Sequence, residues 1–219
     1  MKALRAVSLR EQAAEVIRAG IISGELEAGE IYSATVLAER LGVSPTPVRE
    51  AMLDLASADL VEAVRNRGFR VLTPEERDLD EITELRKMLE VPAMRQVVER
   101  AGDEQLAALE DVIADIEQAA QQGDLAAFLV ADRRFHLGML ELTGNGRLVR
   151  LVGQLRDQTR LVGLRHLAES GRLTASASEH GDVLGALRAR DADHAEELMR
   201  VHLEHTRGIW AGRDEGPAA

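Results

Sequence analysis

The sequence contains no cysteine and few aromatic residues, which make up only 2% of the chain. Without cysteine, the protein has neither disulfide bonds nor metal sites built from thiolates. Because 45% of the residues are hydrophobic, a core can still form, and it must consist mainly of Leu, Val, Ala, Ile and Met. That composition favours helices over sheets.

Long hydrophobic segments are also missing. No apolar run reaches the roughly 18 residues that a membrane-spanning helix needs, and the first residues lack the apolar stretch of a signal peptide. We therefore expect a soluble, cytoplasmic protein that does not enter a membrane. The chain also lacks a phosphate-binding loop, a nucleotide-binding glycine fingerprint and a nucleophile elbow.

Negative charge is unevenly distributed along the chain. The net charge is −11, which by itself argues against a protein that binds nucleic acid. Residues 1–74, however, carry 9 Lys and Arg against 10 Asp and Glu, so nearly all of the acidic excess lies after position 74. Any contact with DNA phosphates must therefore come from the first third of the chain.

Residues 1–74 predict a winged helix-turn-helix domain. Ser8 begins a capping box, and helical periodicity follows it. We expect helices over about 8–24, 35–41 and 45–58, and a hairpin formed by 60–64 and 69–72. Three short helices followed by a hairpin are the elements of this DNA-binding fold, in which the third helix enters the major groove.

The third predicted helix has the features of a recognition helix. Gly42 allows a tight turn before it, and Ser44 is placed to cap its first turn. Ser44, Thr46 and Arg49 then project from the beginning of the helix, where such helices contact base edges. Arg49 can donate two hydrogen bonds to one guanine.

The predicted hairpin would be the wing, with Arg65 and Arg67 near phosphates or the minor groove. The alternative is an ordinary small helical domain, in which Arg49 forms a surface ion pair with Glu50 or Asp54. The turn glycine, the capped helix and the basic hairpin occur in the right order, and this order favours the DNA-binding interpretation.

From residue 75 onward, only helical periodicity is present. We expect six helices, over about 75–100, 103–122, 124–143, 147–167, 174–190 and 192–211. Short connections favour an antiparallel all-α bundle over residues 75–212, with 213–219 as a flexible tail. The predicted fold class is therefore mainly α, with an N-terminal winged helix-turn-helix and a C-terminal helical bundle.

Four residues of the bundle form a candidate metal site. Asp132 and His136 are four residues apart on a predicted helix with apolar neighbours, so both face the same way. His180 and His202 lie near apolar stripes of two other helices. Three imidazoles and one carboxylate suit Zn²⁺, Ni²⁺, Mn²⁺ or Fe²⁺ rather than Ca²⁺ or Mg²⁺. Taken singly, each histidine is more often a hydrogen-bonded residue at the edge of a core. The surface is the expected place for His166, His194 and His205.

The first domain resembles the GntR family of bacterial regulators. The matching residues are Ile22–Leu26, Gly29, Leu37–Ala38, Leu41–Ser44, Pro47–Ala51, Leu55 and Asn66–Gly68. The resemblance implies that Thr46, Arg49 and Gly68 contact the operator. Thr35 and Pro45 depart from members that carry DNA-contacting arginines at those positions, so fewer base-reading arginines remain.

Residues 77–211 resemble the all-helical effector domain of FadR-type GntR regulators, called the FCD domain. The matching residues are Glu84–Arg86, Leu89–Glu90, Asp132, Phe135–His136, Leu140, Gly144–Asn145, Leu148, Glu179–His180, Ala186–Leu187 and His202–Leu203. In metal-binding members, the residues that match Asp132, His136, His180 and His202 bind a divalent metal, for which Zn²⁺ is our first expectation. Those members sense small organic acids, whereas the branch that binds long acyl-CoA lacks these ligands.

An effector carboxylate can complete the coordination of such a metal. Arg86 can then bind a second carboxylate, because guanidinium and carboxylate pair through two parallel hydrogen bonds. Arg86 can equally pair with Glu90, one helical turn away. Weaker effector candidates are Arg133, Arg134 and Arg160.

The expected function is that of a transcription regulator, most simply a repressor, and not an enzyme. One recognition helix makes few contacts, so we expect a homodimer on a palindromic DNA operator, released by a small organic acid. The main alternative is a metal-dependent hydrolase, in which the Asp/His cluster activates water and Glu141 or Glu179 acts as base. A third possibility is a metal site that is purely structural and has no effector.

Overall fold

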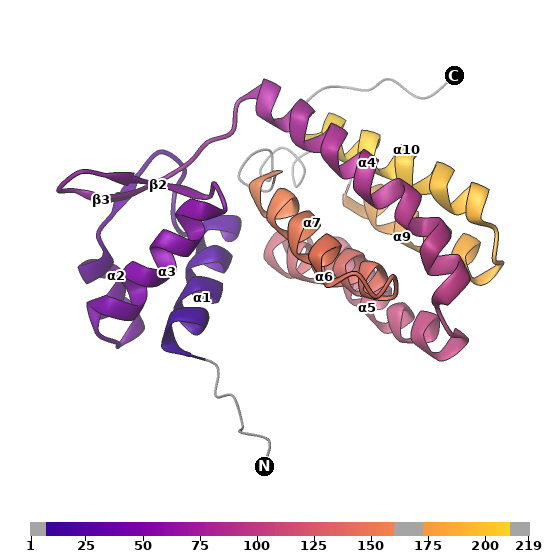
Figure 1. The fold of residues 1–219 in the computed structure, drawn as a ribbon, viewed down its shortest axis with the longest axis horizontal. Coiled ribbons are helices and arrows are strands. Elements are labelled where there is room, and N and C mark those ends of the chain that lie inside the picture. The colour runs from indigo at the N-terminus through magenta and orange to yellow at the C-terminus, as the bar shows by residue number, and fades with distance from the viewer. Residues whose placement is uncertain (1–7, 160–172, 211–219) are drawn as a thin grey trace, which may run out of the picture. The chain divides into compact units, whose positions relative to one another are not determined.

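A computed structural model describes residues 8–159 and 173–210 of the chain. The chain divides into two compact units, Met1–Thr73 and Pro74–Ala219. The first unit combines short helices with a small sheet, and the second is helical throughout its described part (Figure 1). The fold is thus mainly α, as the sequence predicts.

The first unit has the elements of a winged helix-turn-helix. In chain order these are α1 (Leu9–Ser23), β1 (Ile31–Tyr32), α2 (Ala34–Leu41), α3 (Pro45–Ser57), β2 (Val61–Val64) and β3 (Gly68–Val71). β2 and β3 form the predicted hairpin, and β1 pairs with the other edge of β3, so the sheet order is β1-β3-β2 with antiparallel neighbours. β1 was not predicted, because a two-residue strand shows no alternation of polar and apolar residues.

α3 is held in place by its apolar face. Val48, Ala51 and Leu55 are fully buried, and α3 packs against both α1 and α2. Because these residues recur every three or four positions, the opposite face of α3 points outward. The amphipathic pattern of the sequence therefore decides which side of α3 is free to meet a partner.

Gly68 begins β3 and is required by the backbone of the wing. Its φ angle is +132°, and a Cβ atom at this position would lie 2.4 Å from the carbonyl oxygen of Tyr32. Only glycine combines this φ angle with so close an approach of a neighbouring strand. The glycine that the sequence suggests for DNA contact therefore also has a structural role in joining β1 to the hairpin.

The second unit is the helical bundle. Its described helices are α4 (Glu76–Arg100), α5 (Asp103–Gln122), α6 (Leu125–Glu141), α7 (Gly146–Thr159), α9 (Leu173–Arg188) and α10 (Ala192–Trp210). Five of the six agree with the predicted spans to within about two residues. The exception is the span 147–167, which agrees at its beginning, whereas residues 160–167 lie outside the described part of the chain.

The core of the bundle combines apolar and ionisable side chains. α4 packs along α10, and α5 packs against both α6 and α9. Phe135, Met139 and Leu140 of α6 are completely buried. Nine charged or titratable residues of the described ranges are also buried. Asp157 pairs with Arg133, and Arg207 pairs with Asp80. The other seven form one cluster, namely Arg86, Glu90, Asp132, His136, Arg156, His180 and His202. Because such groups are costly to bury unless they are paired or bind a metal, this cluster is the candidate functional site.

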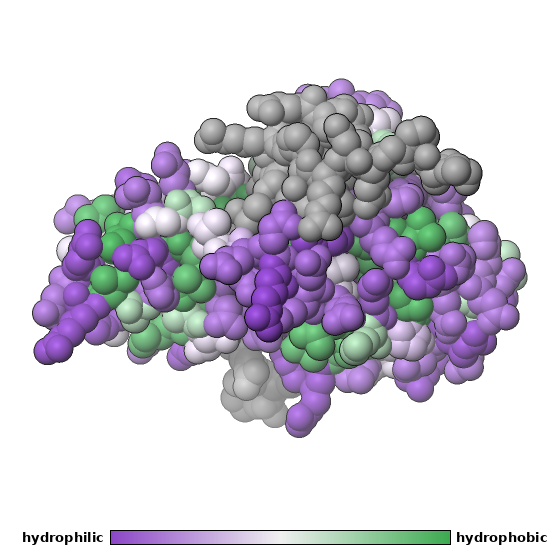
Figure 2. Space-filling model, turned by 90° about the horizontal axis from the view of Figure 1, so that it is seen from above, coloured by the Kyte–Doolittle hydropathy of each residue, from purple (hydrophilic) through white to green (hydrophobic). Residues whose placement is uncertain are grey.

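The face drawn in Figure 2 is mostly hydrophilic where it is coloured, with smaller apolar areas between the hydrophilic residues. On α4, for example, Leu85 and Met88 are exposed. No helix in the described ranges is both long enough and apolar enough to cross a lipid bilayer.

Candidate metal centre and DNA-binding surface

The outward face of α3 carries the residues expected to contact DNA. Ser44, Thr46 and Arg49 are all exposed at the beginning of the helix. Ser44 occupies the capping position, but its side chain does not cap the helix, unlike Ser8 on α1 and Ser33 on α2. Ser8 and Ser33 each accept a hydrogen bond from the third residue of the helix, and in α3 that residue is Pro47, which has no N–H. Among the first three residues of α3, only Thr46 has a backbone N–H, and such a group attracts phosphate oxygens.

Arg49 makes none of the ion pairs of the alternative interpretation. Asp54 is bound to Arg10 of α1, with Nε of Arg10 2.6 Å from Oδ2. Glu50 is exposed, and the described residues provide no ion-pair partner for Arg49. The guanidinium of Arg49 is therefore available to a ligand outside the chain.

The wing also presents unpaired positive charge. Arg65 and Arg67 are exposed in the turn between β2 and β3, and neither forms an ion pair with another described residue. Asn66 between them adopts a positive φ angle of 59°, which the asparagine side chain tolerates better than most. Arg70, in contrast, is neutralised by Glu62 on the neighbouring strand, at 2.6 Å.

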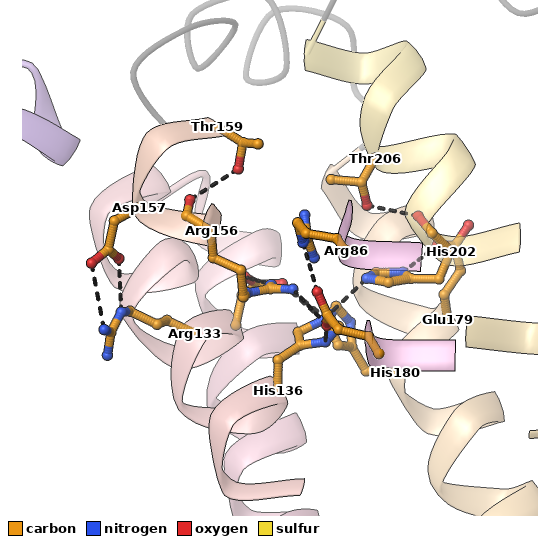
Figure 3. Close-up of polar contacts among 12 residues, drawn as sticks. Arg86, Arg133, His136, Arg156, Asp157, Thr159, Glu179, His180, His202 and Thr206 are labelled. Atoms are coloured by element: carbon orange, nitrogen blue, oxygen red, sulfur yellow. Dashed lines mark hydrogen bonds and ion pairs between the residues drawn. The ribbon is translucent and has the colours of Figure 1, made fainter. Parts of the chain in front are cut away.

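In the bundle, the structure brings together all four predicted metal ligands. Asp132 and His136 come from α6, His180 from α9 and His202 from α10, and all four are buried. One ligand atom from each lies within 4.8 Å of the others. Figure 3 shows the three imidazoles directed toward one another between the helices.

The inward atoms are the Nε2 nitrogens and one carboxylate oxygen. Nε2 of His136 lies 3.1 Å from Nε2 of His202. Oδ1 of Asp132 lies 3.1 Å from Nε2 of His180 and 3.6 Å from Nε2 of His136. These separations match ligand atoms that share one ion at the usual Zn–N and Zn–O distances of about 2.0–2.2 Å.

The other nitrogen of each imidazole lies near an oxygen atom, and for His180 and His202 the two form a hydrogen bond. Nδ1 of His136 lies 3.3 Å from Oε2 of Glu90. Nδ1 of His180 lies 3.1 Å from the carbonyl oxygen of Ala177, and Nδ1 of His202 lies 2.7 Å from Oε2 of Glu179. Such acceptors hold the proton on Nδ1 and leave the lone pair of Nε2 for a metal. The chemistry of the donor set therefore fits a divalent transition metal.

Burial also keeps two of these histidines uncharged. It lowers the pKa of His136 well below the usual value, helped by the positive charge of Arg156. It lowers the pKa of His202 as well, although Glu179 partly offsets the effect. Neutral imidazole is the form that binds a metal.

Two buried arginines and the buried carboxylate of Glu90 surround the candidate metal ligands. Nε of Arg86 lies 2.6 Å from Oε1 of Glu90, so the intrahelical pair that the sequence offers as an alternative does form. Arg156 joins Glu90 at 3.4 Å and Oδ2 of Asp132 at 2.6 Å. Burial raises the pKa of Glu90, but Arg86 and Arg156 outweigh it and leave the pKa far below its usual value. Glu90 and Asp132 thus connect both guanidiniums to the candidate metal ligands, of which Asp132 is one.

Three residues of this site were not assigned to it from the sequence. Glu90 and Glu179 were both named among the residues that resemble the FCD domain, Glu90 also as a partner for Arg86 and Glu179 also as a base for the hydrolase alternative. Arg156 was not considered. Both carboxylate oxygens of Glu179 face histidine nitrogens, because Oε1 lies 2.6 Å from Nδ1 of His205. The sequence signal for these residues was a charged side chain on an otherwise apolar face of a predicted helix. This signal does not identify a buried residue, because many charged residues at the edge of such a face lie on the surface.

The remaining candidates lie elsewhere. Arg133 pairs with Asp157 at 2.8 Å, and Arg134 is exposed and pairs with Asp115. Arg160 and His166 lie outside the described residues. His194 is exposed, as expected, whereas His205 is only half-exposed because it contacts Glu179.

Both units match family models. Residues 9–71 match the model of bacterial regulatory proteins of the gntR family, and residues 81–205 match that of the FCD domain. A DNA-binding helix-turn-helix joined to a helical effector domain defines a class of transcription regulators. The chain belongs to the gntR family of bacterial regulators, in the group with an FCD domain.

Individual relatives agree with this assignment. The regulator McbR of Escherichia coli is 30% identical over 209 residues, which cover 94% of each chain. The solved structure of E. coli McbR matches with a TM-score of 0.86 at 28% identity, over 94% of this chain and 98% of that chain. A D-xylose operon repressor of Paenarthrobacter nicotinovorans is 29% identical over 205 residues, covering 92% of this chain and 88% of its own. These relatives are regulators of transcription and not enzymes.

Proposed function

We propose that the protein represses transcription as a homodimer on a palindromic operator, and that a small organic acid bound at a divalent metal releases it. The helix-turn-helix fold and the relatives establish DNA-binding transcription regulation. We propose DNA contacts for Ser44, Thr46, Arg49, Arg65, Arg67 and Gly68. They are supported by the exposure of Arg49, Arg65 and Arg67, none of which forms an ion pair with another described residue.

The observation that carries metal control is the convergence of Asp132, His136, His180 and His202. Three Nε2 atoms and one carboxylate oxygen face one another, and the Nδ1 atoms of His180 and His202 are hydrogen-bonded on the opposite side of each ring. We propose Zn²⁺ as the ion, with Ni²⁺, Mn²⁺ or Fe²⁺ as substitutes. A bound metal would offer an effector carboxylate an electrophilic partner in place of water.

Helix α4 is the element through which a bound effector would act on DNA binding. This helix carries Arg86 and Glu90, and it begins at Glu76, directly after the last residues of the DNA-binding unit. Arg207 of α10 holds its first turns through Asp80, at 2.7 Å, and the backbone of Glu76. An acid that draws Arg86 away from Glu90 would shift α4 and thereby the DNA-binding unit. Such coupling is typically worth about 1–3 kcal/mol.

The test is operator binding by the full chain in three forms: stripped of metal by a chelator, reloaded with Zn²⁺, and reloaded in the presence of organic acids. The DNA is the region upstream of its own gene, measured by fluorescence anisotropy at several salt concentrations. We expect salt-dependent binding that an acid weakens only in the Zn²⁺-loaded form. Sedimentation of the protein alone and bound to DNA tests the dimer.

A matched pair of variants separates the metal site from the rest of the bundle. His202→Ala removes a ligand, whereas His194→Ala removes an exposed histidine from the same helix. We expect His202→Ala to lose Zn²⁺ and the response to acid, and His194→Ala to keep both. An acid effect that survives removal of the metal would refute metal control, and binding of Zn²⁺ without any acid effect would leave the metal a structural role only.

A further inference from the structure

The first turn of α3 presents apolar side-chain surface to the outside. Pro45 is the first residue of the helix, and both Pro45 and Thr46 are exposed. The ring of Pro45 is apolar, and the side chain of Thr46 carries a methyl group beside its hydroxyl group. Arg49 follows one helical turn further along and is also exposed. The proposed recognition helix therefore begins with apolar surface, and its first exposed charge is a single arginine.

The same turn is poor in hydrogen-bond donors. Pro45 and Pro47 have no backbone N–H, so Thr46 has the only one among the first three residues of α3. The side chain of Pro45 neither donates nor accepts a hydrogen bond. A polar group covered by Pro45 would lose its water without gaining a hydrogen bond, which is costly, whereas an apolar group would gain from burial. The partner of Pro45 is therefore expected to be apolar.

DNA is the partner of this unit, because the chain belongs to a family of DNA-binding regulators. In the major groove, guanine, adenine and cytosine present only donors and acceptors, whereas thymine also presents a C5-methyl group. Recognition helices contact base edges with their first residues. The first and fifth residues of a helix are about 6 Å apart, which is less than two base-pair steps of roughly 3.4 Å. Pro45 and Arg49 therefore lie close enough to contact neighbouring base pairs.

We propose that Pro45 contacts the methyl group of a thymine in each half of the operator, within about two base pairs of the guanine bound by Arg49. The methyl group of Thr46 lies alongside. Burial of the thymine methyl then specifies an A·T pair at a position where an arginine would specify a G·C pair. This inference rests on the proposed function, because it requires α3 to be the recognition helix.

The first test removes thymine methyl groups from the DNA. Within the duplex that the full chain protects upstream of its own gene, each thymine is replaced in turn by deoxyuridine, which keeps every hydrogen-bonding atom of the base. Fluorescence anisotropy gives the dissociation constants. We expect one thymine in each half of the operator at which the replacement weakens binding about fourfold, the factor that corresponds to burial of one methyl group.

A second test assigns this preference to Pro45. Pro45→Ser replaces the apolar ring with a small polar side chain, and the ratio of affinities for the thymine and deoxyuridine duplexes should fall from about fourfold to about one. Because the ratio is taken within one variant, a general change in DNA affinity cancels. Leu53→Ala is the matched control, since it shortens another exposed apolar side chain about two turns further along α3, and it should keep the ratio.

The outcomes separate the inference from the function on which it rests. Operator binding in which no thymine methyl matters would overturn the inference and leave the proposed function intact. An unchanged ratio in a Pro45→Ser protein with normal helix content would do the same. Failure of the full chain to bind duplex DNA of any sequence at low salt would overturn the proposed function, and the inference with it.

Discussion

Glu179 joins His202 to His205 through its two carboxylate oxygens. Oε2 lies 2.7 Å from Nδ1 of His202, whose opposite nitrogen faces the candidate metal ligand His136. Oε1 lies 2.6 Å from Nδ1 of His205. Burial raises the pKa of Glu179, but the hydrogen bonds from the two histidines lower it to below the usual value. Glu179 is therefore a fixed anion that orients one predicted metal ligand.

We predict that Glu179→Gln weakens Zn²⁺ binding about tenfold without unfolding the bundle, because an amide is a weaker acceptor for Nδ1 of His202. Zn²⁺ affinity is measured by competition with a chromophoric chelator. Glu141→Gln, which changes an exposed carboxylate on α6, is the control and should leave the affinity unchanged. An unchanged affinity in both variants would show that Glu179 does not position His202.

Stability of the metal-free protein should depend on pH through His136 and His202. Burial lowers the pKa of both below the ordinary value of 6.5. Below pH 6.5 the two histidines of the unfolded chain take up protons, whereas those of the folded chain stay neutral. The free energy of unfolding therefore has its full value above pH 6.5 and decreases as the pH falls below it. The slope approaches about 1.4 kcal/mol per pH unit for each histidine.

Urea unfolding of chelator-treated protein at a series of pH values measures this slope. His136→Asn should make it shallower, whereas His194→Ala should not change it, because His194 is exposed. A stability that does not change with pH from about 7 to about 5 would contradict the assignment of buried, neutral histidines.

Arg49→Ala should weaken operator binding by about 1–3 kcal/mol and relax the preference for one base pair. The fold should persist, since the Arg49 side chain is exposed and makes no ion pair with the described residues. Anisotropy with a set of single-base operator variants measures both effects. Arg77→Ala, which removes a charge from the surface of α4, controls for general electrostatics. Binding as tight as in the unchanged protein would exclude α3 as the recognition helix.

Gly68→Ala should destabilise the wing by at least about 1–3 kcal/mol, because a Cβ would meet the Tyr32 carbonyl oxygen at a φ angle that other residues rarely adopt. Hydrogen exchange should become faster in β1 and β3. Gly185 is exposed in the middle of α9, and no atom lies within 4 Å of the position that a Cβ would take. Gly185→Ala is the control and should be neutral or stabilising. Normal exchange together with lost DNA binding would assign Gly68 to DNA contact alone.

Much of the fold follows from local patterns in the sequence. Capping at Ser8, the glycine at 42 and the helical spacing of Val48, Ala51 and Leu55 locate the helices of the first unit. The pattern did not locate β1, because its pairing with β3 depends on residues nearly forty positions away. Ser44 was placed correctly at the beginning of α3, but the expected side-chain cap is missing, because Pro47 has no backbone N–H to donate.

The sequence alone, with its resemblance to a known family, determined the class of regulator and the four candidate ligands, because helical spacing and residue chemistry are local properties. Only the tertiary structure decided which charges share the interior. Glu90, Asp132 and Arg156 come from three helices, and Arg156 reaches both carboxylates only because α4, α6 and α7 pack together. The strength of an ion pair depends on the distance between the charges and on their burial. The order of residues along the chain gives neither the distance nor the burial.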